Sequence, residues 1–594
     1  MNTMNDDILR YYEAEMRYLR EAGKEFAEAH PDRARLLNMD RVGERDPYVE
    51  RLFEGFAFLT GRLRQKLDDE LPELTEGLVS LLWPHYLRMI PSLSILALQP
   101  DMASLQKMEE LPGGIEVRSD AIGPDNTRCI YRTTQPVQLL PLALAEAGAI
   151  TRHDGRSAIR LRFDIAPQAR RESLPAVSLR LYLNADRPVA SALHLALTRQ
   201  VSMIEMRIPG VHDGALQPLP QACFTAAGFG ATERLWPKAD NAFGGYQLLL
   251  EYFSFPEKFF FVELAGLDLS VVPEHSSTIE IEAVLSQTYP ADLRFSAENL
   301  RLFCTPVINL FKLDAEPIRV NHHETEYRVL PVLHHGRHVE AYSVDSVNAL
   351  DHASGERYDY VPFASFRHRG GMLRHEAPER FFHTRVRQGT QGLFDTWVIL
   401  GGHAWNNLDA LPEETLSLQV TGTNGMLPRK GLREAGINEL SGSAPHVIAV
   451  NNLAAPTLPL YPPTGDRFQW RVLSHLAPNF LSLMDAEVLR GTLALYDWTD
   501  GELNRRRLNG IRQVAHKTLR QVRAGALERG VEIEVTLDSH AFSGEGDMML
   551  FGELLQRFFA LYADMNLFTQ LVLISLPSGQ RICWPASKSQ AAPL

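Results

Sequence analysis

The chain has 594 residues, with 60 Lys and Arg against 73 Asp and Glu, and a net charge of −13 at pH 7. At about 100–200 residues per domain, this length predicts several domains. Apolar residues make up 45% and charged residues 22%, which excludes a chain that is disordered throughout. The acidic excess argues against a protein whose main task is to coat nucleic acid or an anionic membrane.

The first 92 residues have the apolar spacing of helices. Apolar side chains in steps of three or four between residues 9 and 26 predict one helix. A second helix is expected to begin at Asp46-Pro47, because Asp is a good N-cap and Pro fits the first helical turn. A third is expected from about 72 to 86. The second helix has a wide apolar stripe, formed by Val49, Leu52, Phe53, Phe56, Leu59 and Leu63. We expect these helices to form a bundle, either alone or shared with another chain.

The chain between about 93 and 440 has the alternating apolar pattern of β-strands. The clearest examples are 159–165, 177–183 and 278–284, with further short strands at 358–366 and 396–400. A short helix is expected at 246–253. The pattern predicts two β-rich domains, at 93–300 and 301–440.

From 441 to 594 the pattern is mixed, which predicts a C-terminal α+β domain. Helices are expected at about 467–477, 485–496, 501–523 and 549–563, and strands at 531–537, 571–575 and 581–584. The fold class expected for the whole chain is therefore α+β and multidomain. Its four segments are an N-terminal helical segment, two β-rich middle domains and a mixed α/β C-terminal domain (1–92, 93–300, 301–440 and 441–594).

A basic stretch at 504–523 contains seven Lys and Arg residues and no acid. Its apolar residues are spaced like one face of a helix, at Leu508, Ile511, Ala515, Leu519 and Val522. We therefore expect an amphipathic helix with a cationic outer side. This side is either a solvated surface or a docking surface for an acidic partner. Nucleic acid is a weaker alternative, because no aromatic residues alternate with the bases.

Motifs for catalysis and for cofactor binding are absent. The segment Gly425-Met-Leu-Pro-Arg-Lys430 lacks the second glycine and the hydroxyl residue of a phosphate-binding loop, and Gly228-Phe-Gly230 lacks the third glycine of a dinucleotide fingerprint. There is no GxSxG elbow and no HExxH. We expect no catalytic residue, no cofactor and no enzyme activity. The alternative is a hydrolase or carbohydrate-binding protein with a cryptic site between the β-rich domains.

Histidines form one cluster that could bind metal. His322-His323 and His334-His335 lie near His338. Adjacent histidines on a strand point to opposite faces, so each pair offers at most one ligand to a shared ion. We favour surface or turn histidines and expect no metal.

Four separate cysteines and the lack of long apolar runs indicate a cytosolic protein. The closest cysteines, Cys223 and Cys304, are 81 residues apart, so there is no CxxC pair. No signal peptide and no run of 18 apolar residues is present. We expect a soluble protein that meets a membrane only through partners.

Several long sequence blocks are distinctive. They include YYEAEMRYLREAGKEFAEAHP from Tyr11, DPYVERLFEGFAFL from Asp46, GYQLLLEYFSFPEKFFFVELAGL from Gly245 and WRVLSHLAPNFLSL from Trp470. Over nearly the whole chain, these blocks make the sequence similar to the TssF family (also called VasA or ImpG) of bacterial type VI secretion systems. One departure is Asn424-Gly425, where the family has an Asn-Arg pair, and this leaves any special role of that loop in doubt.

The resemblance implies a structural wedge component of the secretion baseplate. Such proteins assemble with TssG, commonly as two copies around one, and with TssE and TssK. Six wedges surround the spike protein VgrG, carry the tail tube and sheath, and transmit the contraction trigger. The resemblance implies no catalytic residue and a place at the inner face of the cytoplasmic membrane, reached through partners and without insertion. The residues expected at interfaces are Tyr12, Phe53, Phe56, Arg505, Arg506 and Arg507.

Overall fold

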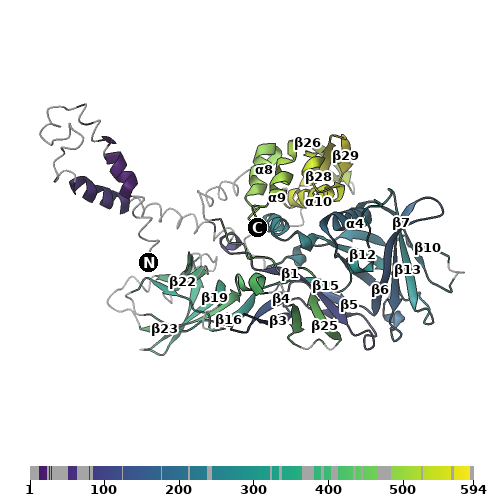
Figure 1. Ribbon diagram of the computed structural model, residues 1–594, viewed down its shortest axis with the longest axis horizontal. Coiled ribbons are helices and arrows are strands. Elements are labelled where there is room, and N and C mark those ends of the chain that lie inside the picture. Colours follow the sequence, from purple (N-terminus) through teal and green to yellow (C-terminus); the bar gives the residue numbers. More distant parts are fainter. Residues whose placement is uncertain are drawn as a thin grey trace. The chain divides into compact units, whose positions relative to one another are not determined.

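The structure is a computed structural model of residues 1–594. It divides into two compact units, one of Met1–Leu82 with Asp466–Ser474, and one of Trp83–Gly465 with His475–Leu594 (Figure 1). The residues that the structure describes are 12–19, 21–22, 26, 29, 48, 51–62, 79 and 84–588, except 124, 175–176, 212–214, 237–243, 321–323, 334–337, 353, 364–379, 390–393, 403–412, 432–435, 443, 445, 464–482, 524–525 and 563–566.

The first unit is helical over its described stretches, 12–19 and 51–62. Both lie inside helices expected from the apolar spacing, which are confirmed over these residues. In the second stretch Ala57 is fully buried and Phe53 half-buried, so the helix has one inward side. Most of the expected third helix lies outside the described residues, and its last part is the 3₁₀ turn η1 (Pro84–Leu87) of the second unit.

A six-stranded sheet in the second unit draws on distant parts of the chain. Its order is β24-β3-β4-β15-β1-β25. The strands are β1 (Leu93–Pro100), β3 (Glu116–Ile122), β4 (Thr127–Thr133), β15 (Cys304–Ile308), β24 (Ile437–Leu440) and β25 (Val447–Asn452). They come from three of the four expected segments, so sheets and segments do not coincide. The boundaries of the four domains stay a prediction.

Two further sheets come from residues 142–301. One has the order β10-β9-β13-β7-β6 and the other β11-β12-β8-β14. Alternation along β7 buries Ile159, Leu161 and Phe163 and turns Arg160 and Arg162 outward. The expected strands at 159–165, 177–183 and 278–284 are confirmed. The bounds are β6 (Leu142–Thr151), β7 (Ser157–Ile165), β8 (Val177–Leu183), β9 (Val201–Arg207), β10 (Gln217–Pro218), β11 (Cys223–Ala226), β12 (Phe261–Leu267), β13 (Thr278–Leu285) and β14 (Leu300–Arg301), with a separate pair β2 (Glu109–Leu111) and β5 (Val137–Leu139).

The largest sheet has the order β16-β23-β19-β20-β21-β22-β18, with β17 also pairing β23. Its core includes Val347, Val398, Leu416, Leu418 and Val420, all nearly inaccessible to water. The strands are β16 (Phe311–Asp314), β17 (Ile318–Arg319), β18 (Glu326–Arg328), β19 (Glu340–Asp351), β20 (Arg357–Pro362), β21 (Arg380–Gln388), β22 (Phe394–Gly402) and β23 (Glu414–Thr423), followed by helix α6 (Leu427–Gly431). The strands expected at 358–366 and 396–400 correspond to β20 and β22.

The C-terminal residues form a sheet with the order β26-β27-β28-β29, in which β30 also pairs β28. Helix α10 (Glu545–Tyr562) connects the parallel strands β27 and β28 and contacts α4 (Arg187–Arg199) and α5 (Gly244–Ser254). The expected short helix at 246–253 is therefore confirmed as α5, and the expected helix at 549–563 as α10. The strands are β26 (Ile511–Arg523), β27 (Ala526–Asp538), β28 (Leu567–Leu576), β29 (Gln580–Cys583) and β30 (Ser587–Lys588).

The long helix expected at 501–523 is wrong beyond its first third. Helix α9 (Glu502–Asn509) ends at the C-cap Gly510, and the chain continues as strand β26. The apolar residues of β26 follow helical spacing, but twelve residue pairs with β27 decide for a strand, and Val531, Ile533, Val535 and Leu537 of β27 alternate clearly. The helix expected at 485–496 is confirmed as α8 (Ala486–Ala494), and the one at 467–477 lies outside the described residues.

Candidate interaction surfaces

An apolar stripe on the helix at 51–62 is open to solvent in the first unit. Leu52, Phe56 and Leu59 are 62%, 61% and 62% exposed. At 3.6 residues per turn these three side chains lie on one side of the helix. We call Leu52, Phe56 and Leu59 the apolar stripe. A soluble chain rarely leaves three large neighbouring side chains this exposed, so the stripe is a candidate protein interface.

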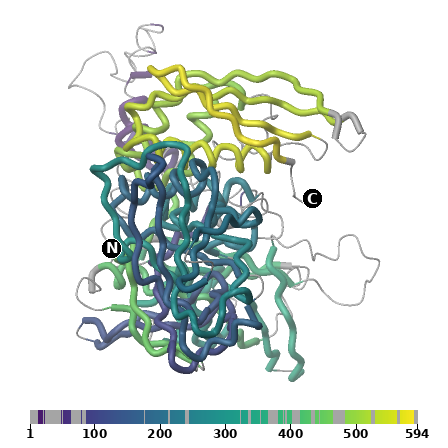
Figure 2. The backbone as a smooth tube through the Cα atoms, turned by 90° about the vertical axis from the view of Figure 1, so that its right-hand side faces the viewer, coloured from purple at the N-terminus to yellow at the C-terminus, as the bar shows by residue number. Residues whose placement is uncertain are grey.

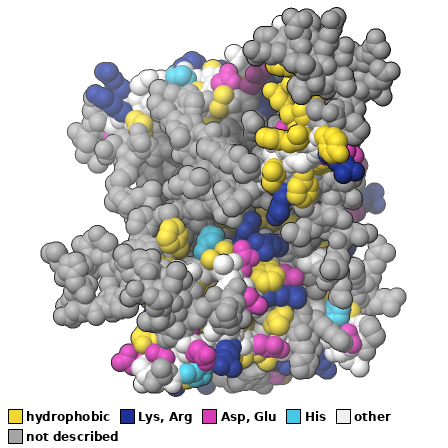
Figure 3. Space-filling view, turned by 90° about the vertical axis from the view of Figure 1, so that its left-hand side faces the viewer, with side chains coloured by type: hydrophobic (Ala, Val, Ile, Leu, Met, Phe, Trp, Pro, Cys, Tyr) yellow, Lys and Arg dark blue, Asp and Glu magenta, His cyan; other side chains and the backbone are white. Residues whose placement is uncertain are grey.

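The other aromatic residues expected at an interface in this unit are less exposed. Phe53 is half-buried on the inward side of the same helix, and Tyr12 is half-buried in the stretch 12–19. Tyr18, which the sequence analysis did not select, is 65% exposed. On the face seen in Figure 3, hydrophobic side chains gather in one area, with Lys or Arg side chains beside them.

Helix α9 separates the three arginines that were expected to act together. Arg505 is exposed and pairs with Asp500, and Arg506 is exposed and donates a hydrogen bond of 3.0 Å to the His540 carbonyl. Arg507 is completely buried. The expectation that Arg507 faces a partner does not fit this burial, because its guanidinium is closed off from any surface.

Arg507 forms the centre of a buried ion pair. Its guanidinium makes two hydrogen bonds to the carboxylate of Asp547 on α10, the Nε bond being 3.1 Å long, and a third of 3.1 Å to Asn504 Oδ1. The ring of Tyr252 lies 5.9 Å from the guanidinium carbon. Asp547 also accepts a 3.1 Å hydrogen bond from the Ser543 backbone. The pair therefore joins α9, α5 and α10.

A second buried group is the Glu340 carboxylate at the start of β19. The Tyr461 hydroxyl lies 2.8 and 2.9 Å from its two oxygens and donates its one proton to the carboxylate. Burial raises the pKa of Glu340 to about 7, against the lowering effect of the Tyr461 hydrogen bond. Gly425 has φ +55°, and a Cβ there would lie 2.3 Å from Glu340 Oε1. Position 425 is therefore closed to larger residues unless the Glu340 side chain moves.

Next to this carboxylate, two buried amides connect sheets. Asn309 Nδ2 donates to the Ile130 carbonyl at 2.7 Å and to Asn424 Oδ1 at 2.9 Å. Asn309 Oδ1 accepts from the Asn424 backbone and from the Thr423 hydroxyl, both at 2.7 Å. All polar atoms of the Asn309 side chain are paired. Asn309 therefore fixes the end of β23 to β4 without the free-energy cost of an unpaired buried polar group.

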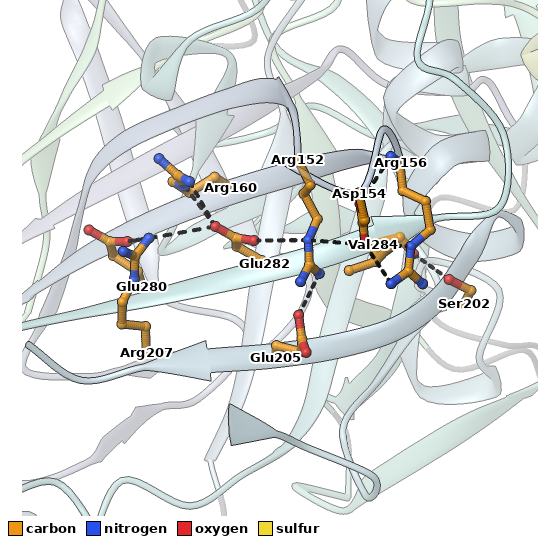
Figure 4. A network of polar contacts seen from close by, with 10 residues as sticks. All are labelled: Arg152, Asp154, Arg156, Arg160, Ser202, Glu205, Arg207, Glu280, Glu282 and Val284. Atoms are coloured by element: carbon orange, nitrogen blue, oxygen red, sulfur yellow. Dashed lines mark hydrogen bonds and ion pairs between the residues drawn. The ribbon is translucent and has the colours of Figure 1, made fainter. Parts of the chain in front are cut away.

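A charged network covers the outer face of the sheet that contains β7, β9 and β13 (Figure 4). Arg160 pairs with Glu282 at 2.8 Å, and Arg207 with Glu280 at 2.6 Å. Arg152 reaches both Glu205 and Glu282. Acids and bases alternate across the strands and pair with each other, so the network joins strands and leaves no excess charge for a ligand.

No group of three or more metal-ligating side chains lies close together among the described residues. His338 contacts the Asp125 carboxylate at 3.2 Å, while the two histidine pairs expected near it lie outside the described residues. All four cysteines are free: Cys129 and Cys304 are buried, and Cys223 and Cys583 are exposed. In the described part of the chain, no helix is long and apolar enough to span a membrane.

Comparison with known families identifies the chain's relatives. The model of the family "Type VI secretion system, TssF" matches residues 4–591. The chain belongs to the TssF family. It is 32% identical to the type VI secretion system component TssF1 of Pseudomonas aeruginosa, over 98% of this chain and 99% of that protein. The expected role as a structural TssF-type component of the type VI secretion baseplate is thereby confirmed.

Two solved structures contain chains with the same fold. A chain in a TssK-TssF-TssG baseplate subcomplex is 50% identical, with a TM-score of 0.80, and the match covers 92% of this chain and 99% of that one. A chain in the baseplate complex of a type VI secretion system is 45% identical, with a TM-score of 0.66, covering 99% and 100%. The α+β multidomain class expected from the sequence is confirmed.

Two structural features were not predicted from the sequence. The Arg507–Asp547 pair joins residues 40 positions apart, and the Glu340–Tyr461 contact joins residues 121 positions apart. Neither pair has a local spacing that marks it. The only available signal was the position of Arg507 beside Leu508 in the apolar run of the basic stretch.

Proposed function

We propose that the apolar stripe at Leu52, Phe56 and Leu59 is the surface through which this chain assembles with other baseplate subunits. All three side chains are more than half exposed on one side of one helix, and this exposure is the main support for the proposal. Burying a side chain of this kind against a partner stabilises a complex by about 1.5–3 kcal/mol. Three such residues supply a central hydrophobic cluster of the kind that dominates binding energy in protein interfaces.

The partners we propose are TssG and TssK, because a similar TssF chain was solved in a complex with both. In this proposal the chain also contacts TssE, the VgrG spike and a second TssF copy, as the family resemblance implies. In this proposal Tyr12 and Phe53 also contribute to interfaces, and exposed Arg505 and Arg506 contribute a second docking site. The chain would act in the cytoplasm, at a baseplate that other subunits attach to the membrane.

Buried ion pairs between separate elements support a scaffold role with no enzyme activity. Arg507 pairs with Asp547, Lys258 with Glu251, and Arg380 with Glu414. In these three pairs each buried ion is matched by an opposite one, and each pair joins separate elements. Catalytic groups are more often held in a cleft with one partner missing, so that they can react with a substrate.

The test is co-purification of the full-length chain with co-expressed TssG and TssK. Phe56→Asp places a charge in the centre of the apolar stripe, and we expect at least about a 30-fold loss of affinity, because central hot-spot residues contribute about 2 kcal/mol or more. The matched control is Glu54→Lys, an exposed charge reversal on another side of the same helix.

The control should retain both partners, and both variants should keep the thermal transition of the natural chain, since both side chains are exposed. Full recovery of TssG and TssK with a folded Phe56→Asp chain would refute the role of the stripe.

A further inference from the structure

Strand β26 leaves one edge of the C-terminal sheet unpaired. It is the end strand in the order β26-β27-β28-β29. Within the described residues, no backbone hydrogen bond outside the ladder with β27 involves residues 514–523. In Figure 2 the hairpin of β26 and β27 runs along the top of the view and its far end projects at the right. A long strand of this kind presents a row of free N–H and C=O groups that can pair with another chain.

The outer half of β26 is also open to solvent. Helices α8 and α9 contact the strand, and Ile511 is fully buried, but residues 516–518 and 520–521 are exposed. On β27 the facing residues Val531 and Ile533 are buried. Because β27 is packed into the sheet, it holds β26 in place and leaves the outer edge of β26 free.

Positive charge gathers on this edge. The strand contains Arg512, Lys517, Arg520 and Arg523 and no acid. Arg512 pairs with Asp538, and Lys517 with Glu534, so these two charges are partly compensated within the hairpin. Arg520 lies directly opposite Arg529 in the register of the hairpin. Like charges facing each other across two strands are destabilising.

No ion pair joins Arg520 or Arg529 to an acid among the residues that the structure describes, and both side chains are exposed. The hairpin therefore carries an electrostatic cost at its outer end that an acidic ligand would remove. A second copy of β26 cannot serve, because it would add further bases to the same edge. Single-stranded nucleic acid is also a poor fit, since β26 has no aromatic side chain on which bases could stack.

We propose that residues 516–521 of β26 bind an extended acidic segment of another baseplate polypeptide as an added strand. Backbone hydrogen bonds to the free edge provide the affinity, and Arg520 with Arg529 select acidic side chains. This site is separate from the apolar stripe and rests on the proposed function only in placing the partner within the baseplate. The charges that bind the acidic segment also prevent the edge from pairing with identical chains.

The test is hydrogen–deuterium exchange on the full chain, free and in baseplates purified from cells. We expect amides in residues 516–521 to exchange at least tenfold more slowly in baseplates. The Arg520→Glu variant should lose this protection while it still co-purifies with TssG and TssK. The matched control is Arg294→Glu, an exposed reversal elsewhere in the chain, which should keep the protection.

A photo-crosslinker at position 518 identifies the ligand in the same preparation. Crosslinks to an acidic segment of another subunit are expected. Crosslinks to a second copy of β26, to nucleic acid or to a basic segment would overturn the proposal. Unchanged exchange at 516–521 on assembly would also overturn it, whereas loss of TssG from the Phe56→Asp chain alone would leave it standing.

Discussion

At the scale of single residues, the charged side chain that joins the elements around α9 is buried and not exposed. Arg507 was expected at a surface because it belongs to a run of three arginines. Its guanidinium instead lies against Asp547, Asn504 and the ring of Tyr252. Helical geometry separates neighbouring residues by about 100°, so a run of three arginines cannot share one side of a helix. The sequence could indicate the basic run but not which member turns inward.

Removing the acid of the buried pair should be costly. In Asp547→Ala the Arg507 charge stays buried without a counter-charge, and we expect a loss of about 3–5 kcal/mol in the free energy of unfolding. The measurement is the thermal or urea transition of the full chain. Glu413→Ala removes the partner of exposed Arg319 and is the matched control, with little expected change. Equal stability of the two variants would contradict the structural role of the pair.

Glu340 should make the stability of the chain depend on pH. Its pKa is raised from 4.5 to about 7 in the folded chain, so the folded state holds a proton that the unfolded state releases. Stability from this group is present below about pH 4.5 and falls as the pH rises through 7. The shift corresponds to a loss on the order of 3 kcal/mol.

The variant Glu340→Gln cannot ionise and should lack this loss. The measurement is the difference in unfolding free energy between the natural chain and the variant at pH 5 and at pH 8. We expect the difference to move in favour of the variant at pH 8. Glu439→Gln, which alters an exposed ion pair with Arg128, is the control and should leave the pH profile unchanged. A constant difference for Glu340→Gln would show that Glu340 does not titrate in this range.

At the scale of elements, the strands in the middle of the chain were more predictable than the C-terminal basic stretch. Strand β7 alternates cleanly between apolar and polar residues, so its period could be read directly. Strand β26 has apolar residues at helical spacing, and only its pairing with β27 decides for a strand. Helical spacing predicted that Leu52, Phe56 and Leu59 share one side of a helix, but not that this side is exposed. The β26 edge was not predictable, because it depends on a pairing between distant residues.

The crossing of α10 and α4 depends on a close approach at Gly546. A Cβ there would lie 2.2 Å from the Ser191 carbonyl oxygen, so Gly546→Ala forces the two helices apart. We expect a loss of about 1–3 kcal/mol in the unfolding free energy. Gly491→Ala in α8 is the matched control, because nothing lies within 4 Å of its added Cβ.

The control should be stabilised by about 0.5–1 kcal/mol, since alanine favours a helix more than glycine does. Opposite signs for these two Gly→Ala changes would support the close helix crossing. Stabilisation by both changes would contradict it.

At the scale of the whole molecule, the chain uses its length for sheets, buried ion pairs and surfaces. The six-stranded sheet joins strands from residues 93 to 452, so distant parts of the sequence are held in one fold. The net charge of −13 is unevenly distributed, because 504–523 holds seven bases and no acid. An uneven charge and an exposed apolar helix are both expected of a subunit that several partners contact.

In the whole molecule, the apolar stripe is proposed as an interface of the assembled baseplate. The most direct measurement is a cryo-EM reconstruction of baseplates purified from cells that express this chain. We predict that Leu52, Phe56 and Leu59 pack against side chains of another subunit and lose most of their exposed area. A reconstruction in which the same three side chains face solvent would rule out this interface.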